Sequence, residues 1–71
     1  MNKQKDTEKV LALSEGQECY IHWFEESGAK VVLKNGLYEL YEVSSGGAEW
    51  YYQSYHRVYI SALVDHAYTW N

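Results

Sequence analysis

The dipeptide Asn35-Gly36 constrains the fold of this chain more than any other feature of its sequence. It separates residues 30–34 (KVVLK), which are rich in β-branched side chains, from residues 37–43 (LYELYEV). A two-residue turn of type I′ needs a positive φ at both central positions, and Asn followed by Gly tolerates this best. The pattern therefore predicts an antiparallel hairpin whose register pairs Lys34 with Leu37, Leu33 with Tyr38 and Val31 with Leu40.

Two further segments follow the hairpin. Residues 44–47 (SSGG) predict a turn, and residues 49–55 (EWYYQSY) predict a third strand because aromatic residues favour strands. Residues 57–70 predict a helix, because apolar side chains recur there every three or four positions.

Residues 15–27 are open to two interpretations. Ser14-Glu15-Gly16-Gln17 fits the capping box that begins a helix, and Gly28 stands where a helix often ends. We therefore expect an amphipathic helix over residues 15–27. The alternative is a strand over residues 18–25, because Tyr, Ile, Trp and Phe all favour extended backbone.

The expected architecture is α+β, with the element order α-β-β-β-α. Three strands form an antiparallel meander, and two helices pack on one face of it. Residues 1–9 (MNKQKDTEK) are charged and lack an apolar pattern, so we expect a disordered polar leader. Residues 10–71 form a single small domain in this scheme, and the pattern leaves the role of residues 10–13 (VLAL) open.

Both faces of the predicted sheet carry large apolar side chains. The aliphatic face, with Val31, Leu33 and Leu40, is the better core. If the turn between the second and third strands has even length, the other face is rich in aromatic residues and uncovered. A patch of this kind is typical of binding surfaces, unless residues 10–13, the leader or a displaced helix cover it. The predicted partner-binding residues on this face are Leu37, Glu39, Tyr41, Trp50 and Tyr52.

The charge balance favours a protein partner over a nucleic acid. The 71 residues contain 10 acidic and 6 basic side chains, for a formal net charge of −4. Binding to phosphate backbones needs clustered Lys and Arg, so we expect no direct nucleic-acid contact. The acidic side of the predicted first helix is a second candidate surface for a basic partner, or an ordinary solvent face. Its members are Glu15, Glu18, Glu25 and Glu26.

Cys19 and His22 form the only short motif with the chemistry of a metal or thiol site. In a helix they would lie one turn apart, but zinc needs two more ligands, and His56 and His66 do not form a second spaced motif. We therefore expect no metal and no cofactor. A single cysteine excludes an internal disulfide and fits a cytoplasmic setting, and the chain has no apolar run long enough to span a membrane.

These features predict a small acidic protein without catalytic activity. We expect it to bind and occlude or modulate a larger protein, which includes nucleic-acid-binding proteins, as phage-type inhibitors of host defence do. The alternative is a structural homo-oligomer that assembles through the aromatic sheet face. A minor alternative is a thiol-dependent or metal-dependent small enzyme that uses Cys19 and His22.

Overall fold

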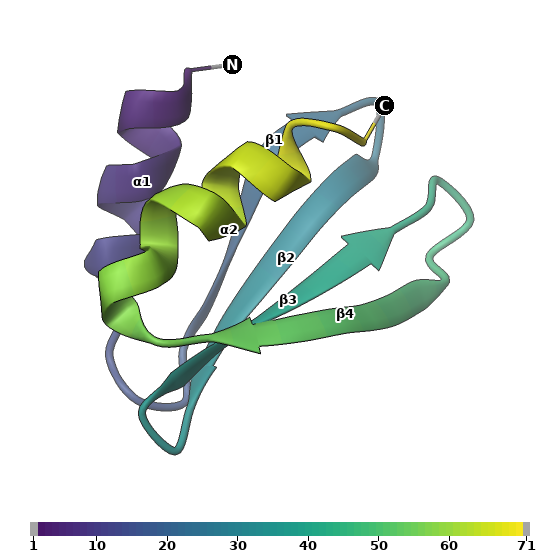
Figure 1. The fold of residues 1–71 in the computed structure, drawn as a ribbon. Helices are drawn as coiled ribbons and strands as arrows, with labels where there is room; N and C mark the ends of the chain where they lie inside the picture. Colours follow the sequence, from purple (N-terminus) through teal and green to yellow (C-terminus); the bar gives the residue numbers. More distant parts are fainter. Residues whose placement is uncertain (1, 71) are drawn as a thin grey trace.

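A computed structural model describes residues 2–70 as one antiparallel sheet with two helices on one of its faces (Figure 1). The sheet has four strands in the order β1-β2-β3-β4, so each strand pairs with its neighbour in sequence. The α+β class and the antiparallel sheet are as predicted, whereas the number of strands is four and not three. The elements are α1 (Lys3–Leu11), β1 (Glu18–Phe24), β2 (Ser27–Lys34), β3 (Leu37–Val43), β4 (Glu49–Tyr55), the 3-10 turn η1 (Arg57–Tyr59) and α2 (Ile60–Ala67).

The hairpin of β2 and β3 forms as its sequence predicts. Asn35 and Gly36 have φ angles of 54° and 78°, the positive values that a type I′ turn requires. Lys34 pairs with Leu37, and the register continues along both strands as expected. The Glu15 carboxylate accepts hydrogen bonds from the backbone N–H groups of both turn residues, which ties the preceding loop to the turn.

The helix predicted over residues 15–27 is wrong, and most of that segment is strand β1. Gly16 has a φ of +86° and occupies the third position of a turn that Gln17 closes by donating its N–H to the Ser14 carbonyl. This geometry is typical of a type II turn, and a helix cannot continue through it. The Gln17 side chain does accept from the Ser14 N–H, as in a capping box, but it does so within the turn.

The connection from β1 to β2 is irregular. Glu25 and Glu26 form its two-residue turn with positive φ angles of 51° and 65°, although glutamate does not favour them. His22, at φ 50°, marks a bulge in β1 opposite Gly28. Gly28 is therefore not a helix end: a Cβ at this position would lie 2.5 Å from the His22 carbonyl oxygen, so only glycine fits beside the bulge.

Residues 3–11 form helix α1, where the sequence predicts a disordered leader. Asn2 caps this helix by accepting a hydrogen bond from the Lys5 N–H through its side chain. Two residues of the helix, Val10 and Asp6, are buried against the rest of the molecule. One apolar anchor and one buried acid produce no apolar periodicity, which is why the sequence pattern does not reveal this helix.

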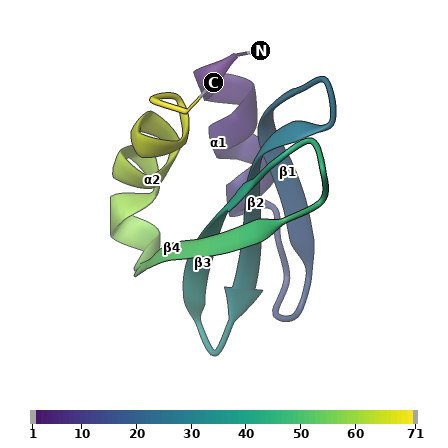
Figure 2. The same cartoon turned by 90° about the vertical axis from the view of Figure 1, so that its right-hand side faces the viewer.

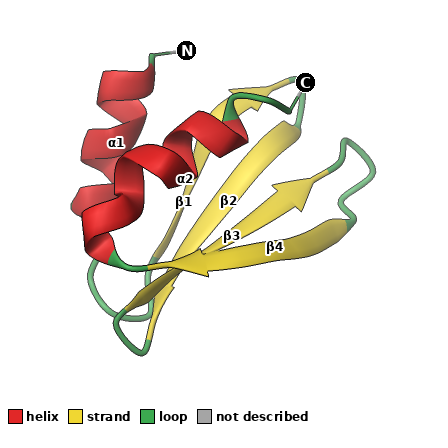
Figure 3. Ribbon diagram, in the orientation of Figure 1, coloured by secondary structure: helices red, strands yellow, loops and turns green. Residues whose placement is uncertain are grey.

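Both helices lie against the same face of the sheet (Figures 2 and 3). They share one hydrophobic core with it. Helix α2 lies within the predicted segment, but it covers only Ile60–Ala67. The aliphatic face of the sheet is the core face, as expected. The buried cluster consists of Val10, Ile21, Ala29, Val31, Tyr38, Leu40, Tyr55, Ile60, Leu63, Val64 and Ala67, and Leu33 packs against it.

A bulge in β4 corrects the predicted faces of that strand. Leu40 pairs with Gln53, but the next residue, Tyr41, pairs with Tyr51, so Tyr52 is an extra residue in the ladder. Because side chains alternate between faces, Tyr51 joins Tyr41 on the face opposite the helices, and Trp50 joins Glu42 on the helix side. Tyr52 turns to α2 and stacks on His66, with ring centroids 3.9 Å apart.

Candidate functional site

The two helices lie on the core face, so no helix among residues 2–70 covers the opposite face of the sheet, which we call the open face. Its central row takes one residue from each strand: Tyr20, Lys30, Tyr41 and Tyr51. Tyr20 is 39% exposed and Tyr51 56% exposed, whereas Tyr41 and Lys30 are half-buried between them. The centre of the open face is therefore largely aromatic.

The tyrosine hydroxyl groups of this row bond to polar residues of the adjacent row. Tyr20 donates to Glu18 and Tyr41 donates to Glu39, each over 3.0 Å, and the Tyr51 hydroxyl lies 2.8 Å from the Ser54 hydroxyl. The hydrogen bonds to the two carboxylates raise the pKa of Tyr20 and of Tyr41, because they stabilise the neutral phenols. Rings held in this way lose little side-chain entropy when another surface packs on them.

The positive charge of Lys30, at the centre of the row, is compensated by a neighbouring carboxylate. Its Nζ lies 2.6 Å from the Glu49 carboxylate and 4.9 Å from the centre of the Tyr41 ring. The hydrogen bond to Glu49 raises the pKa of Lys30, so the ammonium stays charged and paired. The side chain of Lys30 is only 13% exposed and adds little free positive charge to the open face.

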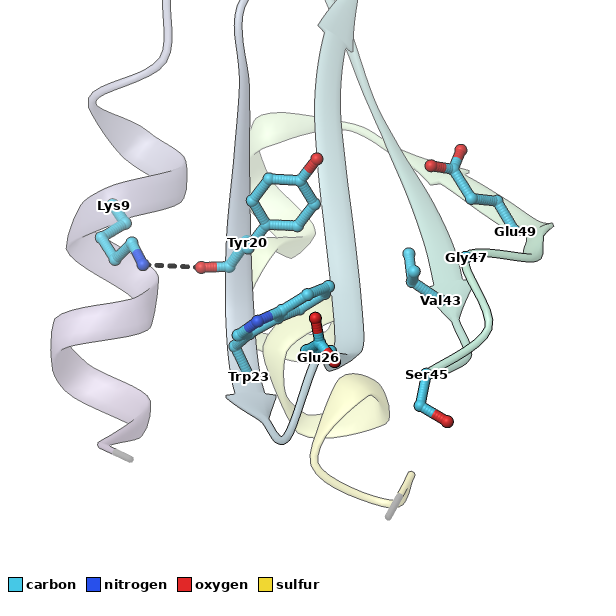
Figure 4. Close-up of a pocket in the computed structure, with 8 residues that line it drawn as sticks. All are labelled: Lys9, Tyr20, Trp23, Glu26, Val43, Ser45, Gly47 and Glu49. Atoms are coloured by element: carbon cyan, nitrogen blue, oxygen red, sulfur yellow. Dashed lines mark hydrogen bonds between the residues drawn. The ribbon is translucent and has the colours of Figure 1, made fainter.

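A groove lies at the end of the open face where the β1–β2 turn approaches the β3–β4 loop (Figure 4). Its volume is about 620 Å³. Tyr20 and Trp23 form one wall, with ring centroids 4.7 Å apart and planes inclined at 55°. Lys9 lies beside this wall and donates from Nζ to the Tyr20 carbonyl over 2.6 Å. Glu26, Val43, Ser45, Gly47 and Glu49 complete the lining.

The predicted partner-binding residues do not form one surface. Leu37, Glu39, Tyr41 and Glu18 lie on the open face, and Glu26 lines the groove. Glu25 lies in the β1–β2 turn, and Glu15 bonds to the β2–β3 turn. Trp50 and Tyr52 lie on the helix side of β4, so their placement on the aromatic face was wrong.

Sequence reasoning missed three aromatic residues of the open face. The helix predicted over residues 15–27 includes Tyr20 and Trp23, and strict alternation along residues 49–55 places Tyr51 on the core face when Trp50 and Tyr52 lie on the other. The strand interpretation of residues 18–25 was the available signal for Tyr20, because it places that side chain beside Lys30 in a sheet. The bulge that turns Tyr51 outward has no comparable sequence signal, since Trp50-Tyr51-Tyr52 are all aromatic.

Cys19 and His22 do not lie one helical turn apart, because their segment is extended. Cys19 is half-buried against the core, and burial raises the pKa of its thiol, which lowers the thiolate fraction. His22 Nε2 lies 2.7 Å from the Trp70 carbonyl oxygen and therefore donates its proton there. Within residues 2–70, no three His, Cys, Asp or Glu side chains gather closely enough to hold a metal ion.

A buried polar cluster joins the two ends of the chain on the core side. Asp6 Oδ2 accepts the backbone N–H of His22 over 3.0 Å and the Tyr68 hydroxyl over 2.6 Å. The rings of His22 and Tyr68 also lie in contact, with centroids 4.2 Å apart. Burial, followed by the hydrogen bond to Asp6, raises the pKa of Tyr68 to about 12. This cluster fastens α1, the β1 bulge and the C-terminal turn to one another.

The fold is a two-layer α+β sandwich: a four-stranded antiparallel meander with one helical layer and one open aromatic face. Comparison with models of known families, with curated proteins and with solved structures finds no match. In the part of the chain that the structure describes, no helix has the length and apolar character needed to cross a membrane.

Proposed function

We propose that this chain is a protein-binding module without catalytic activity of its own, and that it binds a larger, basic protein through the open face. The central row of Tyr20, Lys30, Tyr41 and Tyr51 carries this proposal. Tyrosine and tryptophan dominate the energetics of protein interfaces, and a small domain gains little from aromatic groups left exposed to water. In our proposal the module acts in the cytoplasm by occluding or modulating its partner, as phage-type inhibitors do.

Charge complementarity supports a basic partner. The whole chain has a net charge of −4. On the open face and around its groove, Lys9 and Lys30 already have an acceptor within the molecule. Carboxylates outnumber ammonium groups there: Glu18, Glu25, Glu26, Glu39 and Glu49 against Lys9, Lys30 and Lys34. Such a field steers a positively charged surface toward the face and disfavours nucleic acid.

Two neighbouring residues provide a matched test. Tyr51 and Trp50 are both 56% exposed, but they lie on opposite faces of β4. A partner is first captured with the wild-type protein and then titrated against purified Tyr51→Ser and Trp50→Ser variants. We expect Tyr51→Ser to weaken binding at least tenfold and Trp50→Ser to change it less than threefold. The reverse order, or a captured protein that binds both variants like the wild type, would overturn the proposal.

The free edge of the sheet supports a second candidate, a homo-oligomer. Among residues 2–70, strand β4 pairs with β3 on one side only, and it carries four aromatic residues and a single charged one, Glu49. Exposed edges of this composition favour pairing with another strand, although the bulge at Tyr52 opposes it. Light scattering after size exclusion distinguishes the candidates: a monomer at millimolar concentration excludes the oligomer, and a dimer broken by a proline at Gln53 supports it.

A further inference from the structure

We propose that the groove between the β1–β2 turn and the β3–β4 loop receives an arginine side chain of the protein partner, with the guanidinium stacked on Trp23 and bound to Glu26. This inference rests on the proposed function, since it names the chemistry that the groove recognises on the partner.

The aromatic wall offers a π surface to a cation. Trp23 is 39% exposed, and it is braced by Tyr20 through the 4.7 Å ring contact. Indole faces attract cations more strongly than other aromatic faces do. Trp23 lies in the β1 bulge next to His22, and Figure 4 shows its ring extending over the groove on the side where Glu26 also lies.

Two carboxylates line the groove, and they differ in the number of hydrogen bonds that they already make within the protein. Glu49 uses Oε1 for Lys30, so its second oxygen remains available to a guest. Glu26 makes no side-chain hydrogen bond or ion pair with residues 2–70 in this structure. The ammonium groups that could compete for Glu26 are held elsewhere, because Lys9 bonds to the Tyr20 carbonyl and Lys30 to Glu49. A cation that enters therefore meets a carboxylate that has no partner within the described chain.

The shape of the groove selects arginine over other cations. A methylated ammonium is typically held in a closed cage of aromatic side chains, whereas this groove has aromatic residues on one wall only. A planar guanidinium stacks on a single aromatic face while its edge donates two parallel hydrogen bonds to a carboxylate. The volume of about 620 Å³ exceeds that of one side chain, so it also admits the backbone that carries the arginine.

The test uses the peptide acetyl-Gly-Arg-Gly-amide and its citrulline analogue, which has the same shape without the charge. Both are titrated at constant ionic strength into the ¹⁵N-labelled protein, and the amide and indole N–H signals are followed by NMR. We expect the arginine peptide to shift the Trp23 indole and the Glu26 and Gly47 amide signals in a saturable way. The citrulline peptide should bind at least fivefold more weakly.

Adjacent glutamates supply the control. Glu25 and Glu26 occupy the same turn with similar φ angles and the same charge, but only Glu26 lines the groove. We expect Glu26→Gln to weaken arginine binding at least threefold and Glu25→Gln to change it less than 1.5-fold, with both variants retaining the wild-type amide spectrum elsewhere.

Three results would overturn the inference: equal binding of the citrulline peptide, equal effects of the two glutamine variants, or shifts centred away from the groove. If these occur while partner capture still depends on Tyr51, the open-face proposal stands and only the arginine assignment fails. If the arginine peptide binds the groove but capture ignores Tyr51, the proposed function fails instead.

Discussion

Asp6 holds together parts of the chain that are far apart in sequence, and its removal is the sharpest test of the fold. Asp6 is 7% exposed, and its carboxylate accepts hydrogen bonds from the His22 N–H and the Tyr68 hydroxyl. Asp6→Ala leaves the backbone N–H at the β1 bulge and the half-buried phenol of Tyr68 without this acceptor. The substitution therefore acts on α1, on β1 and on the C-terminal turn at once.

The expected cost follows from these two bonds. A hydrogen bond to a charged group contributes about 1.5–3 kcal/mol, so we expect the loss of both bonds in Asp6→Ala to lower the free energy of unfolding by roughly 3–6 kcal/mol. The core of a domain this small supplies only about 3–5 kcal/mol of net stability. Asp6→Ala should therefore be largely unfolded at 25 °C. Tyr68→Phe removes one of the two bonds and should cost about half as much, roughly 1.5–3 kcal/mol.

Urea denaturation followed by circular dichroism and tryptophan fluorescence measures these changes. Glu8→Ala is the matched control, because it removes an exposed acid from the same helix and should change stability by less than about 0.5 kcal/mol. The double variant Asp6→Ala/Tyr68→Phe should be no less stable than Asp6→Ala alone, because the shared bond is already lost. An Asp6→Ala protein within about 1 kcal/mol of the wild type would refute the reasoning, since two charge-assisted bonds must be worth more.

Three further predictions concern single groups. Because the pKa of Tyr68 is raised from 10 to about 12, its contribution to stability is complete below pH 10 and is lost as the pH rises through 12. In a spectrophotometric titration, the last phenol to ionise should be the one that Tyr68→Phe removes, after Tyr20 and Tyr41, whose pKa values are also raised. A Tyr68→Phe variant that keeps the last phenol would contradict this. Gly28→Ala places a Cβ against the His22 carbonyl and should lower the free energy of unfolding by about 2–4 kcal/mol. In Gly36→Ala the new Cβ meets no atom within 4 Å, so thermal or urea unfolding should show a cost of only about 1–2 kcal/mol. Equal costs would show that the bulge rearranges to accommodate the Cβ. Since burial raises the pKa of Cys19, its reaction with a disulfide reagent at pH 8 should be at least tenfold slower in the folded protein than in urea, and equal rates would show an accessible thiolate.

The parts of the fold that sequence reasoning predicted correctly depend on local chemistry. Asn35-Gly36 sets its own φ angles, and the hairpin register follows from the turn length without reference to the rest of the chain. The apolar spacing of the tail predicts helix α2 for a similar reason, although the helix ends at Ala67 and not at residue 70. The core face is also as predicted: Val31 and Leu40 are paired across the hairpin, both are aliphatic, and both are buried in the core.

The candidate site was predicted less well because it depends on packing between distant segments. Tyr41, Glu39 and Leu37 follow from the hairpin register, so their place on the open face could be derived. Tyr51 reaches that face only through the bulge in β4, which lets Tyr52 stack on His66 of α2. The residues next to Tyr52 in the sequence give no signal of its contact with His66.

The sequence by itself determined the central hairpin, the third strand of the predicted meander and the tail helix, since turn angles and side-chain periodicity are properties of neighbouring residues. Tertiary structure alone decided the state of α1 and β1. Considered in isolation, Gly16 and Gly28 are compatible with a helix or with a strand between them. Which of the two structures forms depends on the side chains that the segment can bury. Ile21 has a place in the core and Asp6 has two donors only when the whole sheet is present, so the energy that selects these elements comes from contacts that no local window contains.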